Sequence, residues 1–306
     1  MDLRQLASKV EEVCRTAGNH ALREQLNPSV IKTSRERGGI SVGHYASDID
    51  SHLQQYVTGA LNEIEPHKSY WDELAGEVRP GDRFWCVGNV DGSINFARNL
   101  SEWTVTVSLF EANDRGEIYP ILGVVHAPAL DLTYMAARGQ GAIRVRRLLT
   151  TEKRERVIPS TWPHLSDSVL CFGMSYFRNE SRRALATVND LTGKPADIKR
   201  IGPVSLDLCK VADGTYDAYF EPSLHSWDIP AVAAGAIVLW EAQGHLSRWD
   251  GSLINWHEAN DIVATNAVID DELMPYLAAR SDNPTVSNPS NDERIARTQE
   301  MPPIYE

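Results

Sequence analysis

The feature that most constrains the fold is an apolar run in the second half of the chain, from Ile229 to Trp240. This run is too short to cross a bilayer, because a membrane-spanning helix needs about 20 apolar residues. Between Ala231 and Leu239 it is apolar nearly all round, which predicts a helix buried inside the protein. Asp228 stands just before it, where a carboxylate would favourably cap the first turn.

The composition is that of a soluble globular protein. With 306 residues, the chain is long enough for one large or two ordinary domains and a sizeable core. The net charge of −12 argues against a nucleic-acid backbone or an anionic membrane as partner. It does not exclude a phosphate ester, because a bound metal ion can invert the local field. The 4 cysteines show no metal-site spacing and the N-terminus has no signal-peptide character, so we expect a cytoplasmic protein.

The first half of the chain combines helical and strand patterns. Residues 2–26 have apolar residues at helical spacing, and a second helical pattern follows Asp48 and Asp50, either of which could cap or begin it. Residues 34–43, rich in Arg and Gly, predict a loop. Alternating patterns then predict strands at these residues: 104–109, 121–125, 132–135 and 142–145.

A polar stretch at 147–166 suggests a boundary between two halves. We therefore predict an N-terminal half over 1–150 and a C-terminal half over 151–280, in which strand and helix patterns alternate. Strands are expected at 169–172, 217–221 and 262–266, and helices at 182–191 and 206–212. Residues 281–306 are rich in Asn, Pro, Ser and charge, which predicts a disordered tail.

A short polar segment follows the strand-like residues 84–87. In it, Asp91 is an oxygen ligand of the kind that magnesium prefers. Gly92 permits close approach of a ligand to the backbone, and the N–H groups of Gly92 and Ser93 could face an anion. The same Asp-Gly-Ser triplet is also common turn chemistry between two strands.

The residues from Trp85 to Phe96 resemble a family signature, W-x-(I/V)-D-P-(I/L/V)-D-G-(T/S)-x-N-F. It belongs to the inositol monophosphatase-like, magnesium-dependent phosphatases, and it is matched at Trp85, Val87, Val90, Asp91, Gly92, Ser93, Asn95 and Phe96. Two positions depart from it, since Gly88 stands for its first Asp and Asn89 for its Pro. Trp227-Asp228 resembles the family's W-D-x-A-A-G segment, and Glu221 precedes Asp228 by the family's spacing. The resemblance covers residues 5–275.

The resemblance implies a layered α-β-α-β-α sandwich, with the site between the halves, and a homodimer. It also implies Mg²⁺ held by Asp72, the Val90 carbonyl, Asp91 and Asp228, with Gly88 at the position of a lost ligand and Asp48 or Glu73 as further candidates. Asp72, Asp91 and Ser93 would be catalytic, while Gly92, Ser93, Ser205 and Glu221 would contact the substrate. From the residues alone, Asp72 and Glu73 also suit an acidic surface turn.

Three explanations of Gly88 stay open at this point. It could be an introduced change, or a natural rearrangement in which Asp48, Asp72, Glu73 or His44 fills in, or the mark of a fold that has left phosphatase chemistry. The sequence therefore predicts a Mg²⁺-dependent hydrolase of a small polyol, sugar or nucleotide monophosphate, impaired by Gly88. The alternative is a non-hydrolytic relative that binds or transforms a phosphorylated metabolite.

Overall fold

The computed structural model describes residues 1–26, 48–70, 78–148, 151–175, 177–257 and 260–281. The helices are α1 (Leu3–Gln25), α2 (Asp48–Ile64), α4 (Ser93–Ala97), α5 (Arg178–Leu191), α6 (Val204–Ala212), α7 (Ile229–Glu241) and α8 (Asp270–Ala278). Short 3₁₀ turns are η1 (Pro128–Leu130), η2 (Leu165–Asp167) and η3 (Ser226–Asp228).

The strands form two sheets. The 7-stranded sheet has the order β1-β2-β3-β4-β5-β6-β7, and all its pairs are antiparallel except β1 with β2. Its strands are β1 (Lys68–Ser69), β2 (Arg83–Val87), β3 (Val105–Ala112), β4 (Ile118–Ala127), β5 (Leu132–Ala137), β6 (Ala142–Leu148) and β7 (Thr151–Arg156). The 5-stranded sheet has the order β11-β12-β10-β8-β9. Its strands are β8 (Val169–Phe172), β9 (Asp197–Lys199), β10 (Ala218–Leu224), β11 (His245–Arg248) and β12 (Asn260–Thr265).

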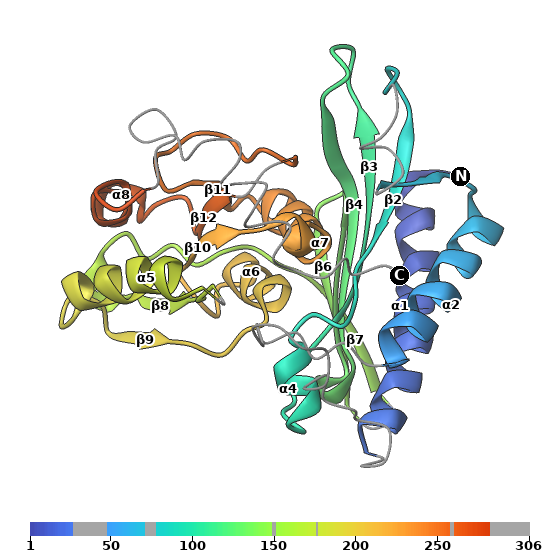
Figure 1. Cartoon of the computed structure of the whole chain (residues 1–306), viewed down its shortest axis with the longest axis horizontal. Helices are drawn as coiled ribbons and strands as arrows, with labels where there is room; N and C mark the ends of the chain where they lie inside the picture. Colours follow the sequence, from blue (N-terminus) through green and yellow to red (C-terminus); the bar gives the residue numbers. More distant parts are fainter. Residues whose placement is uncertain (27–47, 71–77, 149–150, 176, 258–259, 282–306) are drawn as a thin grey trace.

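Helices and sheets alternate in layers (Figure 1). Helices α1 and α2 cover the outer face of the 7-stranded sheet, and α6 and α7 lie between the two sheets. Helices α5 and α8 pack on the far face of the 5-stranded sheet. This α-β-α-β-α sandwich is the architecture that the family resemblance implied.

The apolar helix predicted after Asp228 is α7, and every residue from Ile229 to Leu239 is buried. It packs closely on β4 at Gly123, where an added Cβ would lie 2.3 Å from Cγ2 of Ile237 and 2.6 Å from the carbonyl oxygen of Ala234. Only glycine allows this approach of strand to helix. The position of α7, and with it that of Asp228, is therefore set by tight packing against the central strands.

Strands β1, β7 and β9 were not predicted from the sequence, and β7 is the longest of them. Residues 151–156 form β7 at the edge of the first sheet, within the stretch interpreted as a polar boundary. Its side chains are charged and mostly exposed, as is usual for an edge strand. Cross-strand ion pairs hold it to β6, from Arg144 to Glu155 at 3.1 Å and from Arg147 to Glu152 at 2.9 Å. The first sheet therefore continues past residue 150, and the division into halves stays a prediction.

The helices and the other strands expected from the patterns occur close to their predicted positions. The predicted loop at 34–43 lies outside the described residues, as does the predicted tail apart from residue 281. Within the described ranges, no helix combines the length and apolar character needed to traverse a bilayer.

Candidate active site

Asp91 lies where the first sheet meets the helices between the sheets. Its backbone forms an isolated bridge to Thr104, with hydrogen bonds of 3.0 and 2.9 Å between the two residues. Its carboxylate oxygen Oδ2 accepts the backbone N–H of Ser205, in α6, at 3.1 Å. The hydroxyls of Thr104 and Ser205 are 2.7 Å apart. Both the backbone and the side chain of Asp91 are therefore fixed before any ligand binds.

The turn after Asp91 depends on glycine. Gly92 has φ of 82°, in the left-handed region, and is the N-cap of α4, whose first residue is Ser93. An added Cβ at Gly92 would lie 3.0 Å from the carbonyl oxygen of Glu102 and 3.3 Å from Cβ of Pro203. The conformation and the close packing both exclude a larger residue at this turn.

Asp228 comes from the other half of the chain and ends η3, directly before α7. Its Oδ2 accepts the backbone N–H of His225 at 2.9 Å, and the His225 ring accepts the backbone N–H of Asp228 in return. The Nε2 atom of His225 is 3.1 Å from Oε2 of Glu180, in α5. The ring also stacks on Trp227, with centroids 4.3 Å apart.

Asp91, Glu221 and Asp228 interact electrostatically across the two halves. Burial, followed by the charge of Glu221, raises the pKa of Asp228 well above its ordinary value, and the charge of Asp91 adds to this effect. Burial raises the pKa of Glu221 to about 7, with a further rise from Asp91 and an opposing effect of Arg200. Burial also raises the pKa of Asp91, against the hydrogen bonds from Ser205. Three acids that raise one another's pKa in this way favour a bound cation or a shared proton.

A fourth acid, Asp207, lies behind this group. It is fully buried in α6, accepts the backbone N–H of Gly202 at 3.0 Å, and lies 3.8 Å from Nζ of Lys210. Burial raises its pKa to about 7, and the charge of Asp91 contributes. It was not singled out from the sequence, because a single Asp among the apolar residues of α6 carries no motif.

Position 88 is closed by a neighbour from α7. Gly88 is buried, and an added Cβ there would lie 2.9 Å from Cβ of Pro230 and 3.0 Å from Oγ1 of Thr106. Among the described residues, the buried Thr106 hydroxyl has no hydrogen-bond partner. The place where the family signature has its first Asp is thus occupied by a proline ring.

The other predicted site residues are placed only in part. His44, Asp72 and Glu73 lie outside the described residues; Asp48 begins α2, but its side chain is not described. The backbone N–H of Val90 donates to Oδ1 of Asp50 at 3.0 Å.

Asp50 is therefore a residue that sequence reasoning missed as a site candidate. It is buried at 7% exposure and binds the backbone between Gly88 and Asp91. The signal was present, because Asp50 extends the helical spacing of the buried Leu53, Val57 and Leu61 by one step.

The described residues suit a divalent cation only in part. Asp91 and Asp228 are hard oxygen ligands, and a cation between them would relieve their repulsion. Within the described ranges, however, no group of 3 or more His, Cys, Asp or Glu side chains is arranged to hold a metal ion. Gly88 has no side chain that could serve as a further metal ligand.

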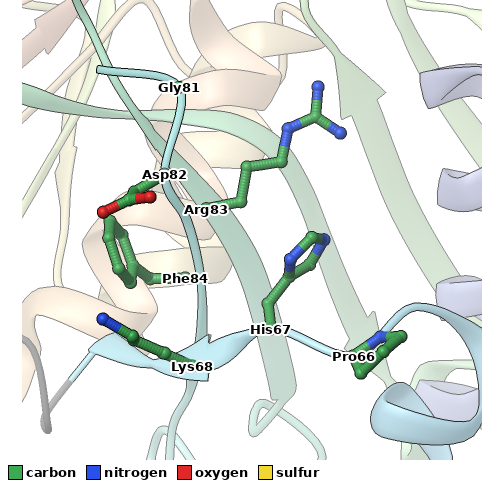
Figure 2. Close-up of a pocket in the computed structure, with 7 residues that line it drawn as sticks. All are labelled: Pro66, His67, Lys68, Gly81, Asp82, Arg83 and Phe84. Atoms are coloured by element: carbon green, nitrogen blue, oxygen red, sulfur yellow. The ribbon is translucent and has the colours of Figure 1, made fainter. Parts of the chain in front are cut away.

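A pocket of about 310 Å³ lies at the other end of β2 (Figure 2). Its lining residues include His67, Lys68 and Arg83, and Figure 2 shows the Arg83 side chain extending away from Lys68. The Arg83 guanidinium donates to Glu111 at 2.8 Å, and His67 is 2.8 Å from Glu65. With these groups already paired and diverging, the pocket is a weaker candidate than the acidic residues around Asp91.

The two sheets with a helix layer between them place this chain among the layered α/β sandwich proteins. Residues 2–299 match the inositol monophosphatase family, and the chain belongs to that family.

Individual relatives carry different names. A protein of Neisseria meningitidis named putative Nus factor SuhB is 29% identical over 274 residues, covering 88% of this chain and 96% of the relative. A histidinol-phosphatase of Streptomyces coelicolor is 31% identical over 235 residues, covering 76% and 84%. The structure of an inositol monophosphatase from Anabaena superposes with a TM-score of 0.70 at 26% identity, covering 92% and 98% of the two chains.

Proposed function

We propose that this protein is a Mg²⁺-dependent phosphatase of a small polyol, sugar or nucleotide monophosphate, with hydrolysis slowed by the glycine at position 88. The observation that carries the proposal is the electrostatic coupling of Asp91 with Asp228, two carboxylates from opposite halves of the chain. Membership of a phosphatase family supports it.

The charge of the site supports a cation. A phosphate ester carries negative charge and would be repelled by ionised Asp91, Glu221 and Asp228. In this proposal Asp91, Asp228, the Val90 carbonyl and Asp72 hold Mg²⁺, with Asp48 or Glu73 as further candidates. When bound, Mg²⁺ neutralises phosphoryl oxygens and lowers the pKa of a coordinated water.

The remaining roles fall to groups around Gly92. The N–H groups of Gly92 and Ser93 would bind the phosphate, and the Ser93 hydroxyl would orient the attacking water with Asp72 as a further catalytic group. Glu221 and Ser205 would contact the leaving group. Glu221 suits a polyol, because a carboxylate accepts hydrogen bonds from hydroxyls.

The test is release of inorganic phosphate from a panel of inositol, sugar and nucleotide monophosphates. We expect slow release that needs Mg²⁺, stops with a chelator, and falls at least 10-fold in Asp91→Asn and Asp228→Asn, since loss of supporting groups alone costs about 10–100-fold. Asp114→Asn, an exposed change in the β3–β4 turn, is the matched control. The phosphatase proposal fails if no panel member is hydrolysed by the native chain or by a variant with Asp restored at position 88.

The second candidate is a non-hydrolytic family member that binds or transforms a phosphorylated metabolite. It is favoured by the closure of position 88 by Pro230, and by a relative named as a Nus factor rather than as a phosphatase. Calorimetric binding of a phosphorylated metabolite without turnover would support it. The family resemblance also leads us to propose a cytoplasmic homodimer, which light scattering of the purified protein tests for its oligomeric state.

A further inference from the structure

We propose that Tyr219 is a positioning residue, which fixes Glu221 against the backbone of Gly173 so that Glu221 offers one oxygen to a hydroxyl of the substrate. The inference deepens the proposed function and rests on it, because it assigns the residues that would make the site prefer phosphate esters with hydroxyls on their organic group. The proposed function gives neither Tyr219 nor Gly173 a role.

Glu221 extends from β10 toward the acidic residues of the candidate site. Tyr219 and Glu221 are two residues apart in this strand, so their side chains lie on the same face of the sheet. Tyr219 packs among the apolar residues of α6 and α7, whereas Phe220 packs with those of α5 and α8 on the opposite face. Glu221 therefore faces the helix layer that also holds Asp91 and Asp228, and it interacts electrostatically with both.

The Tyr219 hydroxyl holds one oxygen of the Glu221 carboxylate. Tyr219 is 1% exposed, and its hydroxyl donates a hydrogen bond to Oε2 of Glu221. Such a bond to a carboxylate is roughly twice as strong as one between neutral groups, and a closely packed ring cannot easily turn away from it. Glu221 itself is partly exposed. Among the described residues its Oε1 has no hydrogen-bond partner, so this is the oxygen left for a ligand.

The backbone of Gly173 lies directly against this pair. Gly173 follows β8, and its N–H donates to the carbonyl oxygen of Phe220 at 2.9 Å, which continues the pairing of β8 with β10. A Cβ at position 173 would lie 2.3 Å from Cδ of Glu221 and 2.5 Å from the hydroxyl oxygen of Tyr219. Glycine therefore gives the two side chains the space that they occupy. A larger residue would displace both the carboxylate and the hydroxyl that holds it.

This arrangement favours a hydroxyl on the ligand over a second anionic group. The free oxygen of Glu221 accepts a hydrogen bond from a hydroxyl but repels negative charge. An ester with hydroxyls on the carbons next to the phosphate can donate this bond, whereas an ester of a plain hydrocarbon ring cannot. Removal of the Tyr219 hydroxyl should therefore weaken binding of the first kind of ester and leave the second kind unaffected.

The experiment compares two probes that share a six-membered ring and a phosphate group. They are myo-inositol 1-phosphate, which has ring hydroxyls, and cyclohexyl phosphate, which has none. Binding to the full chain is measured by calorimetry with Mg²⁺ at about pH 8, where Glu221, with a pKa of about 7, is ionised. We expect Tyr219→Phe to weaken binding of the inositol phosphate on the order of 10-fold and that of cyclohexyl phosphate by less than about 2-fold. Gly173→Ala should have the same selective effect.

Two comparisons separate positioning from a general loss of stability. Tyr134→Phe removes a similar buried hydrogen bond, from Tyr134 to Oδ2 of Asp213 at 2.7 Å, at the opposite end of α6 from Ser205. This variant should lower the Tm without discriminating between the probes. In Glu221→Gln, adding Tyr219→Phe should cause no further selective loss, because the charged acceptor is already gone.

The inference is overturned if Tyr219→Phe weakens both probes equally or neither, or if the native chain binds neither probe. The phosphatase proposal is decided by phosphate release. Selective loss of binding in a chain that hydrolyses none of the panel, even with Asp restored at position 88, would keep the inference and defeat the phosphatase proposal. Hydrolysis of the panel together with equal losses for the two probes would do the reverse.

Discussion

The backbone N–H of Ser205, the second residue of α6, donates a 3.1 Å hydrogen bond to the carboxylate of Asp91. Asp91 lies between strands β2 and β3 of the first sheet, whereas Ser205 belongs to the helix layer between the sheets. This hydrogen bond connects the first sheet to helix α6 beside the group of acidic residues. Stability and cation binding should therefore respond in opposite directions when Asp91 loses its charge.

Asp91→Asn tests this opposition directly. The amide oxygen can still accept the Ser205 N–H, but the repulsion with Glu221 and Asp228 is lost. We expect the metal-free protein to gain on the order of 1 kcal/mol in unfolding free energy. Affinity for Mg²⁺ should fall about 10–100-fold. Urea unfolding with a chelator and calorimetry measure the two quantities; unchanged Mg²⁺ affinity would contradict the assignment.

Glu180 is expected to position Asp228 through His225. One ring nitrogen of His225 accepts the Asp228 N–H, so Nε2 carries the proton and donates to Glu180. Glu180→Ala removes this acceptor and should weaken Mg²⁺ binding about 10-fold, while Glu180→Gln should have a smaller effect because its amide oxygen still accepts. Calorimetry compares both with Glu63→Ala, an exposed change on α2. Equal affinities in the two Glu180 variants would count against a positioning role.

Asp207 predicts a pH dependence of stability. Its pKa rises from 3.8 in the unfolded chain to about 7 in the native protein. Between these values the native state holds a proton that the unfolded state has released, so the unfolding free energy falls as the pH rises. The fall should be on the order of 2–4 kcal/mol for this group. In chelator-treated protein, Asp207→Asn should flatten the curve between pH 4 and 7, whereas Asp114→Asn should leave it unchanged.

Two glycines give a matched test of the packing under α7. Gly123→Ala would place a methyl group against Ile237 and should cost about 1–3 kcal/mol of unfolding free energy. Gly59→Ala, on the exposed face of α2 with nothing within 4 Å, should stabilise by about 0.5–1 kcal/mol. Chemical denaturation of both variants checks the signs. A neutral Gly123→Ala would show that α7 can move away from β4.

Much of the fold followed from the sequence because its core elements are strongly patterned. The buried α7 and the alternating strands β3 to β6 have periodicities that burial imposes on any chain. Strand β7 could not be predicted from apolar periodicity, because an edge strand needs no apolar face and this one is held by cross-strand ion pairs. Which acidic residues from distant parts of the chain lie together could be predicted only from the resemblance to a family, because no local sequence pattern carries this information.

In the candidate site, too, some residues could be recognised from sequence motifs and others only from tertiary packing. Asp91 and Asp228 were recognised because they stand in motifs. Asp50 could have been recognised from its helical spacing, whereas Asp207 acquires its environment from tertiary packing that no sequence pattern predicts. The reason for Gly88 could not be read from the sequence either. Only the structure shows that the ring of Pro230, more than 100 positions later, fills the space where a side chain would stand.

The chain order of Asp91 and Asp228 has a consequence for biosynthesis. The last strand of the first sheet ends at residue 156, yet Asp228 is made only with α7, before strands β11 and β12 of the second sheet. A nascent chain released before that helix has left the ribosome carries Asp91 without its counterpart. Truncated products of this gene should therefore bind cations more weakly than the full chain, however much of their first sheet has formed.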